Sequence, residues 1–137
     1  MTQLRIERLL DGFHCNPPAS DSMVKAFGLR SGLQLPPDYI DFLKIANGGE
    51  GFIGKRLYLI LWKIEDVLSF NVAYKVDDYV PGLILIGSDG GGEAFGFDKT
   101  MSPWPMVRVP LIGMDRSLIQ VIALNFVSFL EFSYRSE

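Results

Sequence analysis

The first apolar pattern in the chain has helical spacing. Charged residues surround the apolar positions of residues 5–13, which predicts an amphipathic helix with one buried face. That face consists of Ile6, Leu9, Leu10 and Phe13. The paired prolines within residues 16–22 then break the pattern, because proline fixes φ and lacks an N–H group. Ser20 or Asp21 can cap a short second helix, whose apolar members include Val24 and Phe27.

The strongest helix prediction lies within residues 35–49. Pro36 and Pro37 suit a first turn, where N–H groups have no helical partner, and Asp38 complements the positive helix end. The predicted apolar face consists of Leu35, Tyr39, Phe42, Leu43 and Ala46. Asn47 and Gly48 tolerate the left-handed conformation that closes a helix, and Gly49 is expected to extend that turn.

The second half of the chain is dominated by short strands. Residues 57–62 predict a strand and residues 64–76 a helix. Residues 83–87 are uniformly apolar, as in a strand covered on both faces, and a turn at 89–92 leads to a returning strand with Phe95 and Phe97. Residues 106–110 and 118–122 predict two more strands, and Asn125 can cap a final helix. The pattern predicts an α+β fold with a mixed or mainly antiparallel sheet packed against helices.

Length and composition narrow the class of protein. The 137 residues are predicted to form a single domain, 1–137, which can bury a core without a metal or a disulfide. Apolar residues make up 48% of the sequence, and the excess can lie in the core or at an interface. A net charge of −3 disfavours nucleic acid as a partner. No apolar run approaches the roughly 18 residues of a membrane span, and the opening residues do not resemble a signal peptide, so a cytoplasmic protein is predicted.

Two glycine-rich segments resemble nucleotide-binding motifs but lack essential parts of them. Residues 49–55 match the phosphate-loop spacing through Lys55, but Arg56 stands where serine or threonine would bind magnesium, and a helix precedes the loop. In residues 87–92, the dinucleotide spacing would require glycine at Phe95, and predicted strands flank the segment. Turns explain both segments. Three consecutive glycines exceed the needs of a tight turn, so we expect another backbone, from the fold or from a partner, to approach there.

The sequence contains no recognisable catalytic or metal-binding set. Cys15 is the only cysteine, which excludes an intramolecular disulfide and suits a reducing compartment. We interpret Cys15 as a small buried hydrophobe instead of a nucleophile paired with the adjacent His14. With one histidine, zinc catalysis is excluded, and neither a metal nor another cofactor is predicted.

Acidic residues gather around several predicted turns. Glu65 and Asp66 suit the opening turn of the fourth helix, and Asp98 is expected beside the glycine-rich hairpin. Solvated turn acids are the simplest interpretation, and an acidic rim for a basic protein partner is the functional alternative. The candidate contact acids are Asp77, Asp78, Asp89 and Glu93.

Three blocks of the sequence together resemble the SUKH superfamily, which is named in part for a yeast cell-wall synthesis regulator. The resemblance covers about residues 35–130 and is carried by the helix ending in Asn-Gly-Gly, the glycine-rich hairpin and the closing aromatic segment. The matching positions are Leu35, Pro36, Asp38, Tyr39, Phe42, Leu43, Asn47, Gly48, Gly49, Gly87, Ser88, Asp89, Gly90, Gly91, Gly92, Asp98, Phe126, Phe129 and Leu130. Asn125 stands where the family more often has serine, and both residues can cap a helix.

The resemblance implies a SUKH-like domain that acts by binding protein. Members look like non-enzymatic modules: many bacterial ones resemble immunity proteins that neutralise polymorphic toxins, often nucleases, and fungal ones resemble scaffolds in cell-wall signalling. The expected partner is therefore a toxin domain, with no nucleic acid, membrane or enzymatic activity. A plain scaffold, or a small-ligand or nucleotide site at the glycine-rich loops, remains the alternative. Most matching residues have structural explanations, so they indicate the fold and not the contact surface.

Overall fold

The structure is a computed structural model that describes residues 2–135. Its helices are α1 (Thr2–Leu9), α2 (Asp21–Ser31), α3 (Pro37–Ile45), α4 (Ile64–Ala73), α5 (Val76–Tyr79) and α6 (Phe126–Arg135), with a 3-10 turn at Arg116–Leu118. Its strands are β1 (Phe13–Cys15), β2 (Gly49–Ile53), β3 (Leu57–Leu61), β4 (Leu83–Ser88), β5 (Glu93–Asp98), β6 (Met106–Pro110) and β7 (Gln120–Ala123). The α+β prediction is confirmed.

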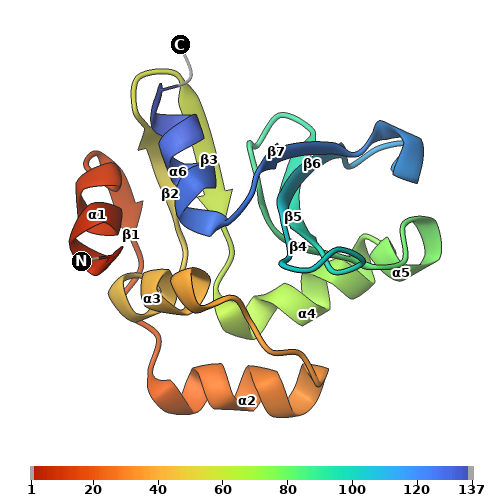
Figure 1. Ribbon diagram of the computed structural model, residues 1–137, viewed down its shortest axis with the longest axis horizontal. Helices are drawn as coiled ribbons and strands as arrows, with labels where there is room; N and C mark the ends of the chain where they lie inside the picture. The colour runs from red at the N-terminus through yellow and green to blue at the C-terminus, as the bar shows by residue number, and fades with distance from the viewer. Residues whose placement is uncertain (1, 136–137) are drawn as a thin grey trace.

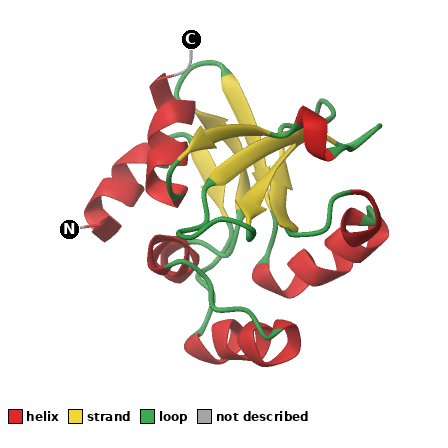
Figure 2. Cartoon of the chain, turned by 45° about the vertical axis from the view of Figure 1, so that its right-hand side comes forward, coloured by secondary structure: helices red, strands yellow, loops and turns green. Residues whose placement is uncertain are grey.

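The strands form one seven-stranded sheet in sequence order, and every neighbouring pair is antiparallel. Figure 1 shows the β2–β3 hairpin standing apart from the group β4–β7, and α6 packs against β7 and β2. Helices α2, α3 and α4 lie at the lower end of the sheet, and Figure 2 shows the helices gathered around the strands. The helices therefore leave part of the sheet surface uncovered.

The sheet divides at β3 and β4 because these strands pair through only two residue pairs. Beyond them, the side chain of Asn71 on α4 replaces a neighbouring strand. Its Oδ1 accepts from the N–H of Leu85 at 2.8 Å, and its Nδ2 donates to the Leu85 carbonyl at 2.8 Å. These bonds satisfy backbone groups of a fully buried strand that would otherwise lack partners.

The core lies between the sheet and the layer of α3 and α6. Tyr39 is buried against Phe97 and Phe126, with ring centroids 5.4 and 5.1 Å apart, and Phe129 packs against Phe95 at 5.2 Å. Burial of each large apolar side chain contributes roughly 1.5–3 kcal/mol, so this cluster is a major source of stability. Its members come from the first, second and third sequence blocks, which explains why the blocks occur together.

Several predicted elements have the expected place. β6 matches the predicted strand 106–110, and β4 is buried along its whole length, as predicted for residues 83–87. The hairpin over 89–92 and the final helix are also confirmed. The strand predicted at 118–122 lies at Gln120–Ala123 instead, because Asp115 caps the 3-10 turn that contains Leu118. The helix predicted over 64–76 ends at Ala73, and the short α5 follows it.

The predictions for the first half need two larger corrections. The first helix ends at Leu9, and Phe13 belongs to β1, since a turn at Gly12 with a φ of 84° separates the two elements. The third helix ends at Ile45, followed by an extended Ala46, so a left-handed Asn47 does not close it. Gly49 does not extend a turn but begins β2, a strand that the glycine-rich sequence concealed.

Candidate protein-binding site

Asn47 links the end of α3 to the start of α4. Its side chain is buried, its Oδ1 accepts from the N–H of Ile64 at 2.8 Å, and its Nδ2 donates to Glu65 Oε1 at 2.7 Å. The bond from Asn47 lowers the pKa of Glu65 below its usual value. Asn47 therefore caps α4 from a distance and fixes its direction relative to α3.

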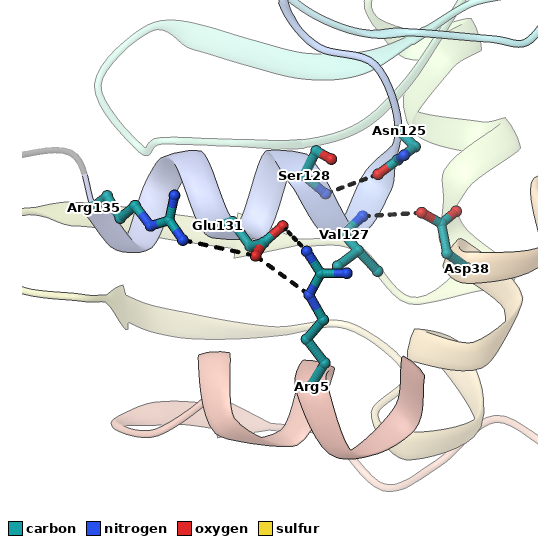
Figure 3. Close-up of polar contacts among 7 residues, drawn as sticks. All are labelled: Arg5, Asp38, Asn125, Val127, Ser128, Glu131 and Arg135. Carbon is teal, nitrogen blue, oxygen red and sulfur yellow. Dashed lines mark hydrogen bonds and ion pairs between the residues drawn. The ribbon is translucent and has the colours of Figure 1, made fainter. Parts of the chain in front are cut away.

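Two residues hold the N-terminus of α6 (Figure 3). Asp38, in the first turn of α3, accepts from the N–H of Val127 at 3.0 Å, and Asn125 accepts from the N–H of Ser128 at 2.8 Å. The predicted cap at Asn125 is confirmed. Asp38 therefore stabilises two helix ends at once. Its carboxylate lies at the positive N-terminal ends of α3 and α6 and joins these helices, which its position in α3 alone does not reveal.

Farther along α6, Glu131 lies between two arginines (Figure 3). It accepts from Arg5 of α1 and forms an ion pair with Arg135 at 4.0 Å. The bond from Arg5 lowers the pKa of Glu131. The Arg5–Glu131 ion pair lies on the surface and joins α1 to α6. It therefore orients these two helices and contributes little to the free energy of unfolding.

Glycines of the motif blocks allow close backbone contacts. A Cβ on Gly48 would lie 2.3 Å from the carbonyl oxygen of Leu61, and one on Gly87 would lie 2.3 Å from that of Ile60. The hairpin turn differs: Gly90 and Gly92 have φ of 76° and 109°. A Cβ placed on Gly90 or Gly91 would lie nearest to side-chain atoms, of Ile60 and Asp89 respectively, and one placed on Gly92 would meet nothing within 4 Å. The expected backbone approach to this turn from within the fold is therefore wrong; positive φ explains two of its three glycines.

Asp98 is buried, with 4% of its surface exposed. Burial raises its pKa, but hydrogen bonds from Thr100 and Arg116 outweigh this effect and hold the pKa below its usual value. Arg116 also donates to the carbonyl of Pro81 at 2.8 Å. Asp98 thus fastens the segment after β6 to the start of β4. It lies on the glycine-rich hairpin, as predicted, at the end of β5 and at the opposite end of the hairpin from Asp89.

The four candidate contact acids lie in two places. Asp77 and Asp78 are exposed on α5, next to the start of β4, whereas Asp89 and Glu93 flank the turn at its far end, roughly 17 Å away at 3.4 Å per residue. Asp89 accepts from the N–H groups of Gly91 and Glu93 and so stabilises the turn, and Glu93 forms an ion pair with Arg108 at 3.6 Å. They do not form one continuous rim.

An aromatic strip covers the exposed face of the β2–β3 hairpin and one side of α4. Phe52 and Tyr58 are cross-strand partners with ring centroids 5.3 Å apart, and the Trp62 ring lies 4.8 Å from Phe70 and 6.1 Å from Tyr74. Phe52, Phe70 and Tyr74 are 49%, 38% and 40% exposed. The strip consists of Phe52, Tyr58, Ile60, Trp62, Phe70 and Tyr74. The sequence patterns do not reveal this strip, because the glycine-rich sequence of β2 predicts a turn.

The opposite side of α4 borders a groove of about 460 Å³. Residues of α2, α4 and α5 form its walls together with the start of β4 and Lys99 after β5, and Asp77 and Asp78 lie at its rim. A second groove, of about 680 Å³, lies between residues 32–38, the segment Ser102–Trp104 and Leu124–Asn125. Three motif positions, Leu35, Pro36 and Asp38, line the second groove.

The remaining chemical candidates do not form a site. Cys15 is exposed on β1, so its interpretation as a buried hydrophobe is wrong, and neighbouring residues of a strand such as His14 and Cys15 point to opposite faces. Among residues 2–135, no group of three or more His, Cys, Asp or Glu side chains could hold a metal ion. Lys55 and Arg56 lie in the turn between β2 and β3, so the chain continues from them into a strand and not into a helix N-terminus. None of the described helices is long and apolar enough to cross a membrane.

Comparison with known proteins identifies a family match and a similar protein. The model of the SMI1 / KNR4 family (SUKH-1) matches residues 18–131, which is most of the chain. The chain is also similar to the uncharacterized protein YnaB of Bacillus subtilis (strain 168), with 32% identity over 75 residues. That match covers 55% of this chain and 47% of YnaB, so the matched segment spans about half the length of the relative.

Proposed function

Because the chain belongs to the SMI1 / KNR4 family (SUKH-1), we propose that it is a non-enzymatic immunity protein that binds and neutralises a cognate toxin. The family match begins earlier than the motif blocks, at residue 18, and so includes α2 as well as the core elements. Protein binding is the general property that the family implies. The toxin, with nucleases among the candidates, is the specific part of the proposal, as is a cytoplasmic location.

The aromatic strip is the observation that supports protein binding most directly. Tyrosine, tryptophan and phenylalanine are enriched at protein interfaces, and a few such residues often supply most of the binding energy. Each exposed ring already contacts another ring of the strip: Phe52 contacts Tyr58, and Phe70 and Tyr74 contact the buried Trp62. These rings would therefore lose little side-chain freedom on binding. A typical interface buries about 1,600 Å² in total, and the strip would form its centre.

The candidate acids would act mainly on the rate of association. Asp89 borders the strip, since a Cβ placed on the adjacent Gly90 would lie 3.4 Å from Ile60 Cδ1. Asp77 and Asp78 lie beyond α4 and are exposed. Exposed charges at an interface rim mostly change the association rate and its salt dependence, so these acids would attract a basic toxin without supplying the main affinity.

The small-ligand alternative finds less support in the site. The segment that resembles a phosphate loop is formed by β2 and a hairpin turn, and the glycine-rich turn lies between β4 and β5. Both lack the strand-to-helix geometry that exposes backbone N–H groups to a phosphate. The scaffold alternative shares the binding surface and differs only in its partner, so an assay must decide between them.

The proposal is tested by co-expressing the chain with the toxin domain encoded beside its gene. We expect cell survival and a complex that remains intact in gel filtration. The substitutions Phe52→Ala and Tyr74→Ala together should abolish both. A matched control is Phe132→Ala with Tyr134→Ala, because these residues are 45% and 42% exposed but lie on α6. Their melting temperatures identify any variant that fails only because it unfolds.

The outcomes separate the parts of the proposal. If cells die equally with and without the protein and no complex forms, the immunity function is wrong. A stable complex with some other cellular protein in that case would favour the scaffold function. If the α6 control abolishes binding and the strip variant does not, the immunity function stands and the strip is not the interface.

A further inference from the structure

The groove beside α4 combines an apolar floor with charged walls. Leu83 and Ile84 of β4 are buried at its base, and Leu33 and Leu68 are partly buried beside them. The volume of about 460 Å³ is large enough for a few side chains of a peptide. Phe70 of α4 and Tyr74, which directly follows this helix, belong to the aromatic strip, whereas Leu68 and Val72 of α4 line the groove. A partner seated on α4 could therefore contact both surfaces.

The charged residues that line the groove have no partners within the described structure. They are Arg30, Lys75, Lys99, Asp77 and Asp78. Ion pairs do form elsewhere in the described structure, as in Arg5–Glu131, Arg108–Glu93 and Arg116–Asp98. None of the five groove residues takes part in an ion pair among residues 2–135. Three cations against two acids make the groove locally positive, although the whole chain carries −3.

The backbone at Lys75 is also exceptional. Its φ is 57°, and it is the only non-glycine residue with positive φ in the described part of the chain. This conformation turns the chain between α4 and α5, so that Val72 on one helix and Asp77 on the next line the same groove. Glycine would be less strained at this position, so we infer that the lysine side chain has a function there.

We propose that the groove binds an extended segment of the partner protein that carries a carboxylate side chain next to apolar ones. The carboxylate would lie between Arg30, Lys75 and Lys99, and its apolar neighbours would cover Leu33 and Leu68. Charge complementarity determines this choice, because the three cations exceed the two acids of the groove by one charge, which one carboxylate would balance. Asp77 and Asp78 at the rim would then select a basic residue adjacent in the same segment. For the identity of the partner, this inference rests on the proposed function.

The first test needs no toxin. Acetyl-Leu-Glu-Leu-amide is titrated into the ¹⁵N-labelled full chain, alongside analogues with Gln or Lys in place of Glu. The Glu peptide should shift the amide signals of Val72, Lys75, Leu83 and Lys99 and bind at least tenfold more tightly than either analogue. Absence of binding by the Glu peptide at about 10 mM, which corresponds to less than about 3 kcal/mol of affinity, would overturn the inference. Equal binding of all three peptides would also overturn it, because charge would then not matter.

The second test uses charge reversal. The double substitution Lys75→Glu with Lys99→Glu should lower the affinity for the Glu peptide and the affinity for the toxin at least tenfold each. Lys25→Glu with Arg8→Glu is the matched control, since both cations are exposed and neither lines the groove or belongs to the β2–β3 hairpin. If the complex forms and the groove variant binds as tightly as the control, this inference is wrong and the proposed function is unaffected. If no toxin complex forms with the unsubstituted chain, the proposed function fails, and the peptide titration alone decides the inference.

Discussion

Replacing Asn47 tests whether this residue caps the N-terminus of α4, to which it does not belong. The side chain satisfies the N–H group of Ile64, which is buried, through a 2.8 Å bond. A buried N–H left without a partner costs about 1–3 kcal/mol, and loss of the hydrogen bond from Asn47 to Glu65 adds about 1 kcal/mol. Asn47→Ala should therefore lower the free energy of unfolding by about 2–4 kcal/mol.

Asn125→Ala is the matched control for this substitution. Asn125 also caps a helix, through a 2.8 Å bond to the N–H of Ser128, but that site is exposed and water can replace the lost bond. The cost should be only about 1 kcal/mol. Urea unfolding followed by circular dichroism measures both values, and at roughly 4 °C per kcal/mol the melting temperatures should differ by several degrees.

Asn47→Gly distinguishes the two interpretations of this position. If Asn47 only terminated α3 in a left-handed conformation, glycine would be tolerated or favoured there. If Asn47 caps α4, glycine should cost about as much as alanine, because both lack the side-chain oxygen. A variant Asn47→Gly as stable as the original, or an Asn47→Ala no more costly than Asn125→Ala, would refute the cap.

Three further predictions follow from single sites. Gly48→Ala should destabilise the protein by at least about 2 kcal/mol more than Gly32→Ala. The two glycines have similar φ, 73° and 70°, but only a Cβ on Gly48 would meet a backbone oxygen. Equal losses of stability in urea unfolding would contradict this. The folded pKa of Asp98 lies below its ordinary 3.8, so its stabilising effect is present above about pH 5 and is lost as the pH falls through the folded pKa. The stability difference between the protein and Asp98→Asn should accordingly shrink below about pH 4 in urea titrations, and a difference that grows there would show the sign to be wrong. EDTA followed by dialysis should leave the unfolding curve unchanged, whereas a marked loss of stability would reveal a metal site.

The sequence was most informative where structure depends on neighbours in the chain. The apolar run at 83–87, the β-rich run at 106–110 and the cap at Asn125 each predicted an element that is present, because burial on both faces, strand propensity and capping are local properties. The three motif blocks indicated the family through their sequence patterns alone, whereas the contact of their aromatic residues in one core cluster is a tertiary feature. Locality also explains the main error, since alternating glycines in β2 resemble a turn until β1 and β3 are placed beside them.

The sequence by itself thus determined the fold class, the positions of most elements and the family. Only the tertiary structure determined what the polar residues bind and which surfaces remain free. The hydrogen bond between Asn47 and Ile64 joins residues 17 positions apart, and the one between Asp38 and Val127 joins residues 89 positions apart. Neither bond can therefore be predicted from the local sequence pattern. The aromatic strip and the charged groove arise in the same way, from segments that meet at α4 only when the chain folds. Binding surfaces depend on which side chains the packing leaves exposed, and that is a property of the whole arrangement of elements.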